Sequence, residues 1–309
     1  MAKPRNDFVD RLQYLGLRLV TMMLHTWSLD LNLAAARLLG DIMYAVDRRH
    51  RHRALANIRR SFPDMPEPVR REMARESMRQ MFLLAVEVMF TTRLVQIPTF
   101  AKYIDVDKVS EVLGLMMDKH HGLIMLTGHY GNWEILGYAF ATLGFETTSV
   151  ARAMDNPYIN EWMLGVRERR GQKIIGKKGA TDDVLRTLDQ HGAVGFIADQ
   201  NAGPKGIFVD FFGRKASTYK SIGLLAMEKE VPIIVGYARR VGKGFRFRLG
   251  MSDLIWPKDW KDQPDPLRYI TQRYTAAVEK FVREDPGQYL WVHRRWKTRP
   301  KGEEPEAYD

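Results

Sequence analysis

The sequence predicts an α/β fold in which a mixed, largely parallel sheet follows a helical N-terminal region. Apolar residues recur at helical spacing through most of residues 1–118. From about residue 119, short apolar runs of strand length alternate with helical segments, a pattern typical of parallel sheets. Residues 239–244 have the composition of a hairpin turn, which adds an antiparallel pair.

The N-terminal region contains two long helical stretches, at 8–45 and 68–92, separated by a Pro-containing break at 61–66. The second stretch carries an apolar stripe at helical spacing. Packing in the core is the default explanation of this stripe, and a groove for an acyl chain is the alternative. The stripe consists of Met78, Met81, Phe82, Val86 and Met89.

The second region alternates strands and helices and ends in an amphipathic helix at 267–284. The predicted strands are 123–127, 147–151, 193–198, 233–238 and 245–249. The predicted helices between them are 132–143, 156–170, 180–190 and 219–229. We therefore divide the chain into a helical region at 1–118, an α/β core at 119–298 and a polar tail at 299–309, together forming one compact domain.

The composition excludes several kinds of site. A chain of 309 residues buries a large core, and 45% hydrophobic with 28% charged residues is ordinary for a globular protein. It has no cysteine, so disulfides, thiolate zinc sites and cysteine nucleophiles are excluded. The paired histidines at 50/52 and 120/121 have no carboxylate at a ligand spacing, and we expect no metal.

The net charge of +11 predicts an acidic partner. Each basic cluster suits a solvated helix face, but nearby Trp and Tyr also suit a membrane interface. Nucleic acid accepts the same mixture, yet no helix-turn-helix, RNA-recognition or zinc-finger pattern is present, so we expect no nucleic acid. The candidates for membrane or phosphate contact are Arg48, Arg49, Arg51, Arg294 and Arg295.

The most apolar stretch, residues 19–36, is interrupted by His25, Asp30 and Asn32. A spanning helix needs about 20 mostly apolar residues. We therefore expect amphipathic helices that lie on the bilayer surface or pack in the core.

The strongest candidate site follows the strand predicted at 123–127. His129 comes directly after that strand, in a Gly-rich turn, and Glu134 stands at the start of the next helix. Glu134 is placed to accept a hydrogen bond from one ring nitrogen, leaving the other as a base for a hydroxyl proton. No Ser or Cys nucleophile occupies the turn, which favours direct attack by a substrate hydroxyl. The alternative is a buried structural histidine with an ordinary first-turn acid.

Five further positions complete the candidate site. Asn132 is a helix N-cap candidate, and the backbone N–H groups near Gly131 are placed to bind an oxyanion. Arg152 follows the second predicted strand and suits a phosphate or an oxyanion. Asp199 and Gln200 follow the third strand. Asp199 is able to assist His129, to pair with Arg152 or to orient the acceptor.

Several short motifs occur in one order along residues 10–298 and resemble the bacterial lipid A biosynthesis acyltransferases, the lauroyl and myristoyl transferases of the lysophospholipid acyltransferase superfamily. The superfamily motif His-x4-Asp/Glu corresponds to His129 through Glu134. The other matching segments are 57–63, 151–157, 198–200, 211–216 and 291–297.

The resemblance implies an αβα sandwich with a helical N-terminal region. It implies acyl transfer from acyl carrier protein, or sometimes coenzyme A, to a glycolipid hydroxyl, with no cofactor. His129 would be the general base, Glu134 its orienting partner, and Arg152 and Asp199 site residues. It also implies attachment to the cytoplasmic face of the bacterial inner membrane.

Other members of the superfamily leave the acceptor open. A lysophospholipid, a mannoside glycolipid or an aminolipid is the alternative to a lipid A-type glycolipid. A basic membrane-binding or nucleic-acid-binding protein is the remote alternative. Acyl chain length and oligomeric state are not encoded in these motifs.

Overall fold

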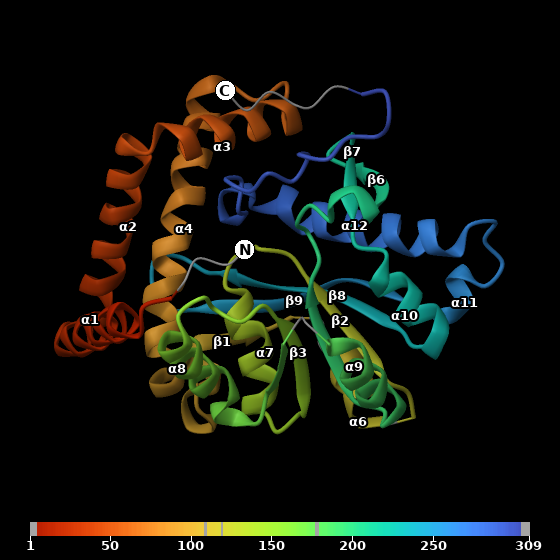
Figure 1. Cartoon of the computed structure of the whole chain (residues 1–309), viewed down its shortest axis with the longest axis horizontal. Coiled ribbons are helices and arrows are strands. Elements are labelled where there is room, and N and C mark those ends of the chain that lie inside the picture. Colours follow the sequence, from red (N-terminus) through yellow and green to blue (C-terminus); the bar gives the residue numbers. More distant parts are fainter. Residues whose placement is uncertain (1–4, 108–109, 119, 177–178, 304–309) are drawn as a thin grey trace.

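A seven-stranded sheet forms the centre of the computed structural model, which describes residues 5–107, 110–118, 120–176 and 179–303 (Figure 1). The strand order is β1-β9-β8-β2-β5-β3-β4. Neighbouring strands are parallel except β8 and β9, which are antiparallel. The strands of the sheet are β1 (Ile104–Val106), β2 (Leu123–Thr127), β3 (Thr147–Ala151), β4 (Lys173–Gly176), β5 (Ala193–Ile197), β8 (Ile233–Arg240) and β9 (Phe247–Ile255).

A separate antiparallel ribbon is formed by β6 (Ile207–Phe211) and β7 (Arg214–Thr218). The N-terminal helices are α1 (Asp7–Thr26), α2 (Leu29–Val46), α3 (Arg48–Ser61), α4 (Glu67–Leu94), α5 (Phe100–Tyr103) and α6 (Ser110–Asp118). The later helices are α7 (Trp133–Thr142), α8 (Pro157–Arg167), α9 (Ala180–Asp189), α10 (Ser221–Lys229), α11 (Pro257–Trp260) and α12 (Pro266–Glu284). Single 3₁₀ turns are η1 (Ile97–Thr99), η2 (Glu168–Arg170), η3 (Gly203–Lys205) and η4 (Pro286–Gln288).

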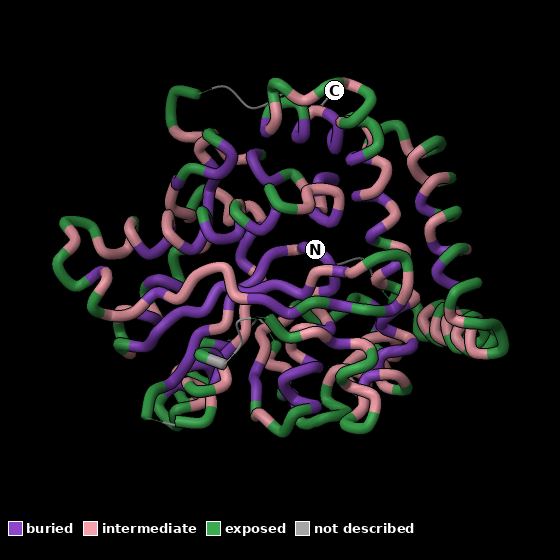
Figure 2. The backbone as a smooth tube through the Cα atoms, turned by 180° about the vertical axis from the view of Figure 1, so that it is seen from behind, coloured by how far each residue is buried: buried purple, intermediate pink, exposed green. Residues whose placement is uncertain are grey.

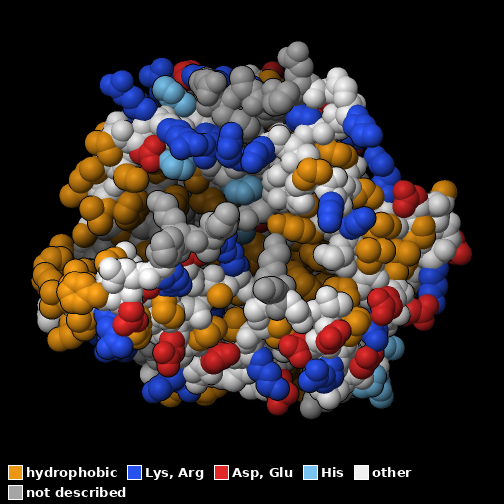
Figure 3. Space-filling view, viewed as in Figure 1, with side chains coloured by type: hydrophobic (Ala, Val, Ile, Leu, Met, Phe, Trp, Pro, Cys, Tyr) orange, Lys and Arg blue, Asp and Glu red, His pale blue; other side chains and the backbone are white. Residues whose placement is uncertain are grey.

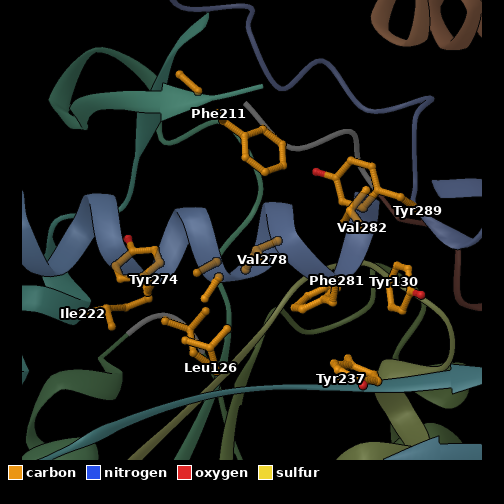
Figure 4. Close-up of a cluster of buried hydrophobic side chains, with 14 of the residues drawn as sticks. Leu126, Tyr130, Phe211, Ile222, Tyr237, Tyr274, Val278, Phe281, Val282 and Tyr289 are labelled. Atoms are coloured by element: carbon orange, nitrogen blue, oxygen red, sulfur yellow. The ribbon is translucent and has the colours of Figure 1, made fainter. Parts of the chain in front are cut away.

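Helices cover both faces of the sheet, as the predicted αβα sandwich requires. Successive strand side chains point to opposite faces, so Ile124 and Leu126 enter one hydrophobic core while Leu123 enters another. The first core is completed by α9, α10 and α12, and Figure 4 shows Val278 and Phe281 of α12 beside Leu126 and other buried side chains. The opposite core is completed by α6 and α7. Figure 2 shows the buried residues concentrated in the strands.

All five strands predicted from the sequence are present, and the sheet is mixed and largely parallel as expected. The strands β1, β4, β6 and β7 were not predicted. Strand β1 lies within the stretch predicted to be helical and pairs with β9, so the sheet draws one edge strand from that region. The tail at 299–309 is described only to residue 303. In this part, Arg299 donates a hydrogen bond to the backbone oxygen of Lys215 at 2.8 Å.

The first two helices leave many apolar side chains in solvent. No residue of α1 is buried, and Phe8 is 73% exposed. Leu12, Leu15 and Leu19 are also exposed. Among the described residues no single helix has the length and apolar composition of a membrane span, although α4 together with the segment Ile97–Tyr103, bent by 114°, passes that test as a pair. An unpartnered apolar face of this size is typical of an interaction surface.

The long helix α4 places a carboxylate inside the protein. Glu87 is fully buried and forms a two-point ion pair with Arg240 at the end of β8, with N–O distances of 2.5 and 2.6 Å. Arg240 also donates to the side-chain oxygen of Gln80. Since a buried charge is tolerated only when paired and hydrogen-bonded, this contact ties α4 to the sheet.

The same carboxylate holds the turn that carries His129. Glu87 accepts a hydrogen bond from the side-chain amide of Asn132 at 2.9 Å. Gln288 of η4 accepts from the Arg240 N–H at 2.8 Å and donates to the Arg240 carbonyl. The Gln288 carbonyl in turn accepts the Gly131 N–H at 3.0 Å. One buried polar network therefore joins the helical region, β8, η4 and the turn at 128–132.

We expect Glu87→Ala to lower the free energy of unfolding by about 3–5 kcal/mol, because it leaves the Arg240 guanidinium buried without its counter-charge. Urea titration followed by circular dichroism measures the change. Glu72→Ala on the same helix is the matched control: Glu72 is exposed, and its loss should change stability by less than about 0.5 kcal/mol. Equal unfolding midpoints for the two variants would contradict the role of the network.

Candidate active site

Strands β2 and β5 are parallel neighbours, and this pairing brings His129 and Asp199 together. Thr127 and Ile197, the last residues of the two strands, are register partners, so both side chains follow at the same sheet edge. The Asp199 carboxylate accepts the backbone N–H of His129 at 2.7 Å and lies 2.7 Å from its ring nitrogen Nδ1. Asp199 is 6% exposed. The carboxylate thus fixes both the backbone and the ring of His129.

The electrostatics of this pair favour the charged form of the histidine. Burial lowers the pKa of His129, but the charge and hydrogen bond of Asp199, with the charge of Glu134, leave that pKa above its ordinary value. Burial raises the pKa of Asp199, yet the charge and hydrogen bonds of His129 bring it down to about 2. Asp199 is therefore ionised at neutral pH and stabilises a proton on the ring.

The second ring nitrogen of His129 faces Gln200. Its Nε2 lies 3.2 Å from the side-chain nitrogen of Gln200. In the neutral form of the ring, with the Nδ1 proton directed at Asp199, Nε2 carries the lone pair and accepts from the Gln200 amide. Trp133 packs edge-on against the ring, with centroids 4.9 Å apart. These contacts fix the ring orientation and assign Nε2 as the basic atom.

The expected hydrogen bond from the His129 ring to the Glu134 carboxylate is corrected by the structure. Glu134 instead forms a two-point ion pair with Arg167 of α8, at 2.8 and 2.7 Å. Asp199 holds the ring nitrogen that Glu134 was expected to hold. The reason is that Glu134 lies in the first turn of α7, opposite a guanidinium whose fork matches a carboxylate. Glu134 still contributes its charge to the His129 site.

The expected oxyanion contact through the amides near Gly131 is also corrected. The N–H groups of Gly131 and Asn132 donate to the carbonyls of Gln288 and Ala238, at 3.0 and 2.9 Å. Gly131 has φ of 55°, and a Cβ there would collide with the Ala238 carbonyl. Asn132 is fully buried and is confirmed as the N-cap of α7, accepting the Ile135 N–H at 3.0 Å. Both residues shape the turn from inside the protein.

A cavity of about 620 Å³ opens in front of the histidine. We call it the His129 cavity. His129, Glu134, Arg167 and Gln200 line its polar end, and Arg152 also lines it. Its remaining wall is largely apolar and includes Val150, Ala151, Ala180, Val184, Phe196, Ile197, Ile222, Leu224 and Leu225. A largely apolar wall beside a few convergent polar groups is typical of a ligand site.

The predicted site residues Arg152, Asp199 and Gln200 converge on this cavity or on His129 itself. Arg152 is 80% exposed and pairs with Asp155 at 3.1 Å, so it stands at the cavity rim. Of the three roles open to Asp199, the hydrogen bond to His129 is the one present. Gln200 contacts the ring with its side chain and accepts from Arg295 with its carbonyl, at 3.2 Å.

The basic residues predicted for membrane or phosphate contact divide into two groups. The prediction of membrane or phosphate contact is corrected for Arg295, which is only 2% exposed. It donates to the Gln200 carbonyl, to the Ser217 carbonyl at 2.5 Å and to the Thr218 hydroxyl at 2.6 Å. Arg295 therefore stabilises the backbone of the turn at Gln200 from inside the protein. Arg51 donates to two carbonyls at the C-terminal end of α2. Arg48, Arg49 and Arg294 are exposed.

Two participants in the site were missed from the sequence. Arg167 gave no signal, because an arginine in an amphipathic helix is ordinarily a solvated residue. Glu87 carried a signal: it shares a helix face with Leu83 and Phe90, both fully buried, and a lone charge on an apolar face points to a buried partner. The described residues contain no group of three or more His, Cys, Asp or Glu able to hold a metal ion.

Residues 6–298 match the family model of bacterial lipid A biosynthesis acyltransferases. The chain is 27% identical over 262 residues to a lipid A biosynthesis acyltransferase of Haemophilus influenzae, covering 83% of this chain and 80% of that protein. It is 26% identical over 273 residues to the lipid A biosynthesis myristoyltransferase of Escherichia coli, covering 86% and 80%.

Among solved structures, the chain is similar to the 1-acyl-sn-glycerophosphate acyltransferase PlsC of Thermotoga maritima, with a TM-score of 0.36 and 16% identity over 82% of this chain and 95% of that one. The family model spans nearly the whole chain, including the turn that carries His129 and the strand end that carries Asp199. The chain is an acyltransferase and belongs to the bacterial lipid A biosynthesis acyltransferase family.

Proposed function

We propose that the protein transfers a fatty acyl chain from an acyl thioester to a hydroxyl of a lipid A-type glycolipid, with His129 as the general base. The observation that carries this proposal is the Asp199–His129 pair at the mouth of an apolar cavity. Asp199 accepts the Nδ1 proton, which leaves Nε2 to take the proton of the acceptor hydroxyl.

The reaction proceeds by direct attack in this proposal. The acceptor oxygen bonds to the thioester carbonyl carbon as its proton passes to Nε2, and the Asp199 carboxylate stabilises the imidazolium. The tetrahedral intermediate then collapses, the carbon–sulfur bond breaks, and the imidazolium returns its proton to the leaving thiolate. The chain has no cysteine, and the ring contacts of His129 are to Asp199, Gln200 and Trp133. This environment supports a mechanism without an acyl-enzyme.

The cations of the His129 cavity supply charge for the oxyanion. The amides of Gly131 and Asn132 are committed to other carbonyls, so they do not serve this purpose. Arg152 at the rim remains the candidate named from the sequence, and Arg167, held by Glu134, lines the same cavity. Preorganised donors of this kind contribute roughly 2.7–4 kcal/mol to transition-state stabilisation. Glu134 thereby acts through Arg167, as a positioning residue.

The thioester donor in this proposal is carried by acyl carrier protein or by coenzyme A, and no cofactor takes part. The protein works at the cytoplasmic face of the bacterial inner membrane as a peripheral enzyme. Support comes from α1, whose apolar side chains are exposed, and from the exposed basic residues Arg48 and Arg49 at the start of α3. Apolar insertion and attraction to anionic headgroups act together at such a surface.

His129→Ala should abolish nearly all acyl transfer, because general-base catalysis contributes about 10²–10⁴-fold and no neighbouring group replaces Nε2. The assay follows transfer from a panel of acyl thioesters to a lipid A-type glycolipid in detergent micelles. His120→Ala is the matched control, since that side chain is 77% exposed and forms a surface ion pair with Asp118. A folded His129→Ala protein with near-normal turnover would overturn the proposal.

The pH dependence tests the Asp199–His129 pair. A general base must be neutral, so kcat/KM should fall as pH drops through the His129 pKa, which lies above the usual value near 6.5. Asp199→Asn removes the charge that raises this pKa, so the acid limb should move to lower pH while the plateau falls. Asp189→Asn, at an exposed carboxylate paired with Lys229, should leave the limb in place. An unmoved limb in Asp199→Asn would contradict the pairing.

Membrane binding tests the α1 surface. In Leu12→Gln/Leu15→Gln/Leu19→Gln, affinity for vesicles containing anionic lipid should fall by at least about tenfold, because one buried leucine is worth at least about 1.5 kcal/mol. Met117→Gln, at a side chain 70% exposed on α6, should bind as the unmodified protein does. Vesicle sedimentation measures both. Unchanged binding by the triple variant would place the contact elsewhere.

A further inference from the structure

A second cavity, of about 500 Å³, lies between the N-terminal helices and the C-terminal segment. We call it the basic cavity. Its wall includes Met43 of α2, and Met81 and Phe82 of α4. Arg53, Arg294 and Lys297 also line it. It thus combines an apolar wall with three permanent positive charges. Figure 3 shows Lys and Arg side chains gathered along one edge of the hollow on this face.

The negative charge in the basic cavity is already committed. Asp47 is the single carboxylate among its lining residues. It accepts the His50 N–H at 3.0 Å and lies 2.6 Å from Nδ1 of the His50 ring. Asp47 therefore caps helix α3, and the cationic side chains Arg53, Arg294 and Lys297 outnumber it among the lining residues of the cavity.

The inner end of the basic cavity reaches the catalytic pair. Asn201 lines it and directly follows Gln200, whose amide contacts His129. His293 also lines it and interacts electrostatically with Asp199 and His129. Burial lowers the pKa of His293 to about 4, so its ring is neutral at pH 7. Its Nδ1 is buried and has no hydrogen-bond partner among the described residues.

Direct attack requires both substrates at once, and the turn at Gln200–Asn201 has a cavity on each side. More apolar residues line the His129 cavity than the basic cavity, which suits the acyl chain of the donor. The basic cavity is lined by Met43 of α2, a helix whose Leu39, Ile42 and Val46 are exposed apolar residues. A lipid held in a membrane reaches the basic cavity along that surface, whereas a water-soluble thioester carrier does not need it.

Building on the proposed function, we propose that the basic cavity binds the phosphorylated headgroup of the acceptor glycolipid, with Arg294 and Lys297 contacting its phosphate and the methionine wall contacting its chain. Arg and Lys are the usual phosphate-binding side chains. Methionines adapt to irregular apolar groups. The proposal divides the site into a donor cavity and an acceptor cavity that meet at His129.

The test combines Arg294→Gln with Lys297→Gln, both at exposed positions whose loss should not unfold the protein. Kinetics are measured with a lipid A-type glycolipid carrying its phosphate monoesters, and with the same lipid after phosphatase treatment. The double variant should raise KM for the phosphorylated acceptor by at least about tenfold. KM for the thioester, and kcat/KM for the dephosphorylated acceptor, should stay unchanged. Arg268→Gln/Lys261→Gln is the control, removing two exposed charges at the other end of the molecule.

Two kinetic outcomes overturn the proposal. A rise in KM for the thioester alone would assign these cations to the donor, and an equal loss with both acceptors would assign them a structural role. Binding is also measured without turnover, by calorimetry in the His129→Ala background, using the phosphorylated glycolipid and inorganic phosphate as separate probes. Weakened glycolipid binding supports the acceptor cavity even if acyl transfer itself fails. Binding that the double variant leaves intact contradicts it, whatever the activity.

Discussion

The ion pair between Glu87 and Arg240 is the contact on which the arrangement of the site depends. It is enclosed in the protein interior, where an unpaired charge is far more costly than in water, so neither partner tolerates the loss of the other. Through Asn132 and Gln288 the pair also fixes the turn that presents His129. The N-terminal helices are therefore part of the catalytic scaffold, in addition to carrying the apolar surface of α1.

The sequence predicted the position of His129 at the end of a strand but not the identity of its hydrogen-bond partner. His129 stands where the end of an apolar run places it, and five residues of separation made Glu134 the natural partner by proximity in the chain. Asp199 is 70 residues away, and only the pairing of β2 with β5 brings it to the ring. Local spacing determines what lies on one helix turn, whereas strand order determines which distant ends meet. Arg167 escaped prediction for the same reason.

Strands with a clear apolar or β-branched pattern were mostly predicted correctly, and strands with a weak pattern were missed. Strands β2, β5 and β8 are central and consist largely of apolar residues, β3 is rich in β-branched residues, and β9 begins with a short apolar segment; all five were predicted. Strand β1 has three residues, and β4 is an edge strand with an exposed lysine and a glycine, so neither carries a hydrophobic signal. The β6–β7 ribbon stands outside the main sheet, and β7 (Arg214–Thr218) consists mostly of polar residues, so it carries no apolar pattern. Where the pattern of burial is weak, only tertiary pairing defines the strand.

In the structure, the side-chain amide of Gln200 blocks Nε2 of His129. Because it occupies the lone pair of Nε2, an incoming alcohol has to displace that contact before the ring can accept its proton. A single water molecule makes few other contacts that would compensate for displacing the Gln200 amide. A lipid bound at several points does make such compensating contacts. Arg295 holds the backbone carbonyl of Gln200 in place, and the Gln200 side chain is not part of that contact. In the proposed mechanism, this exchange favours an anchored alcohol over water as the group that receives the acyl chain.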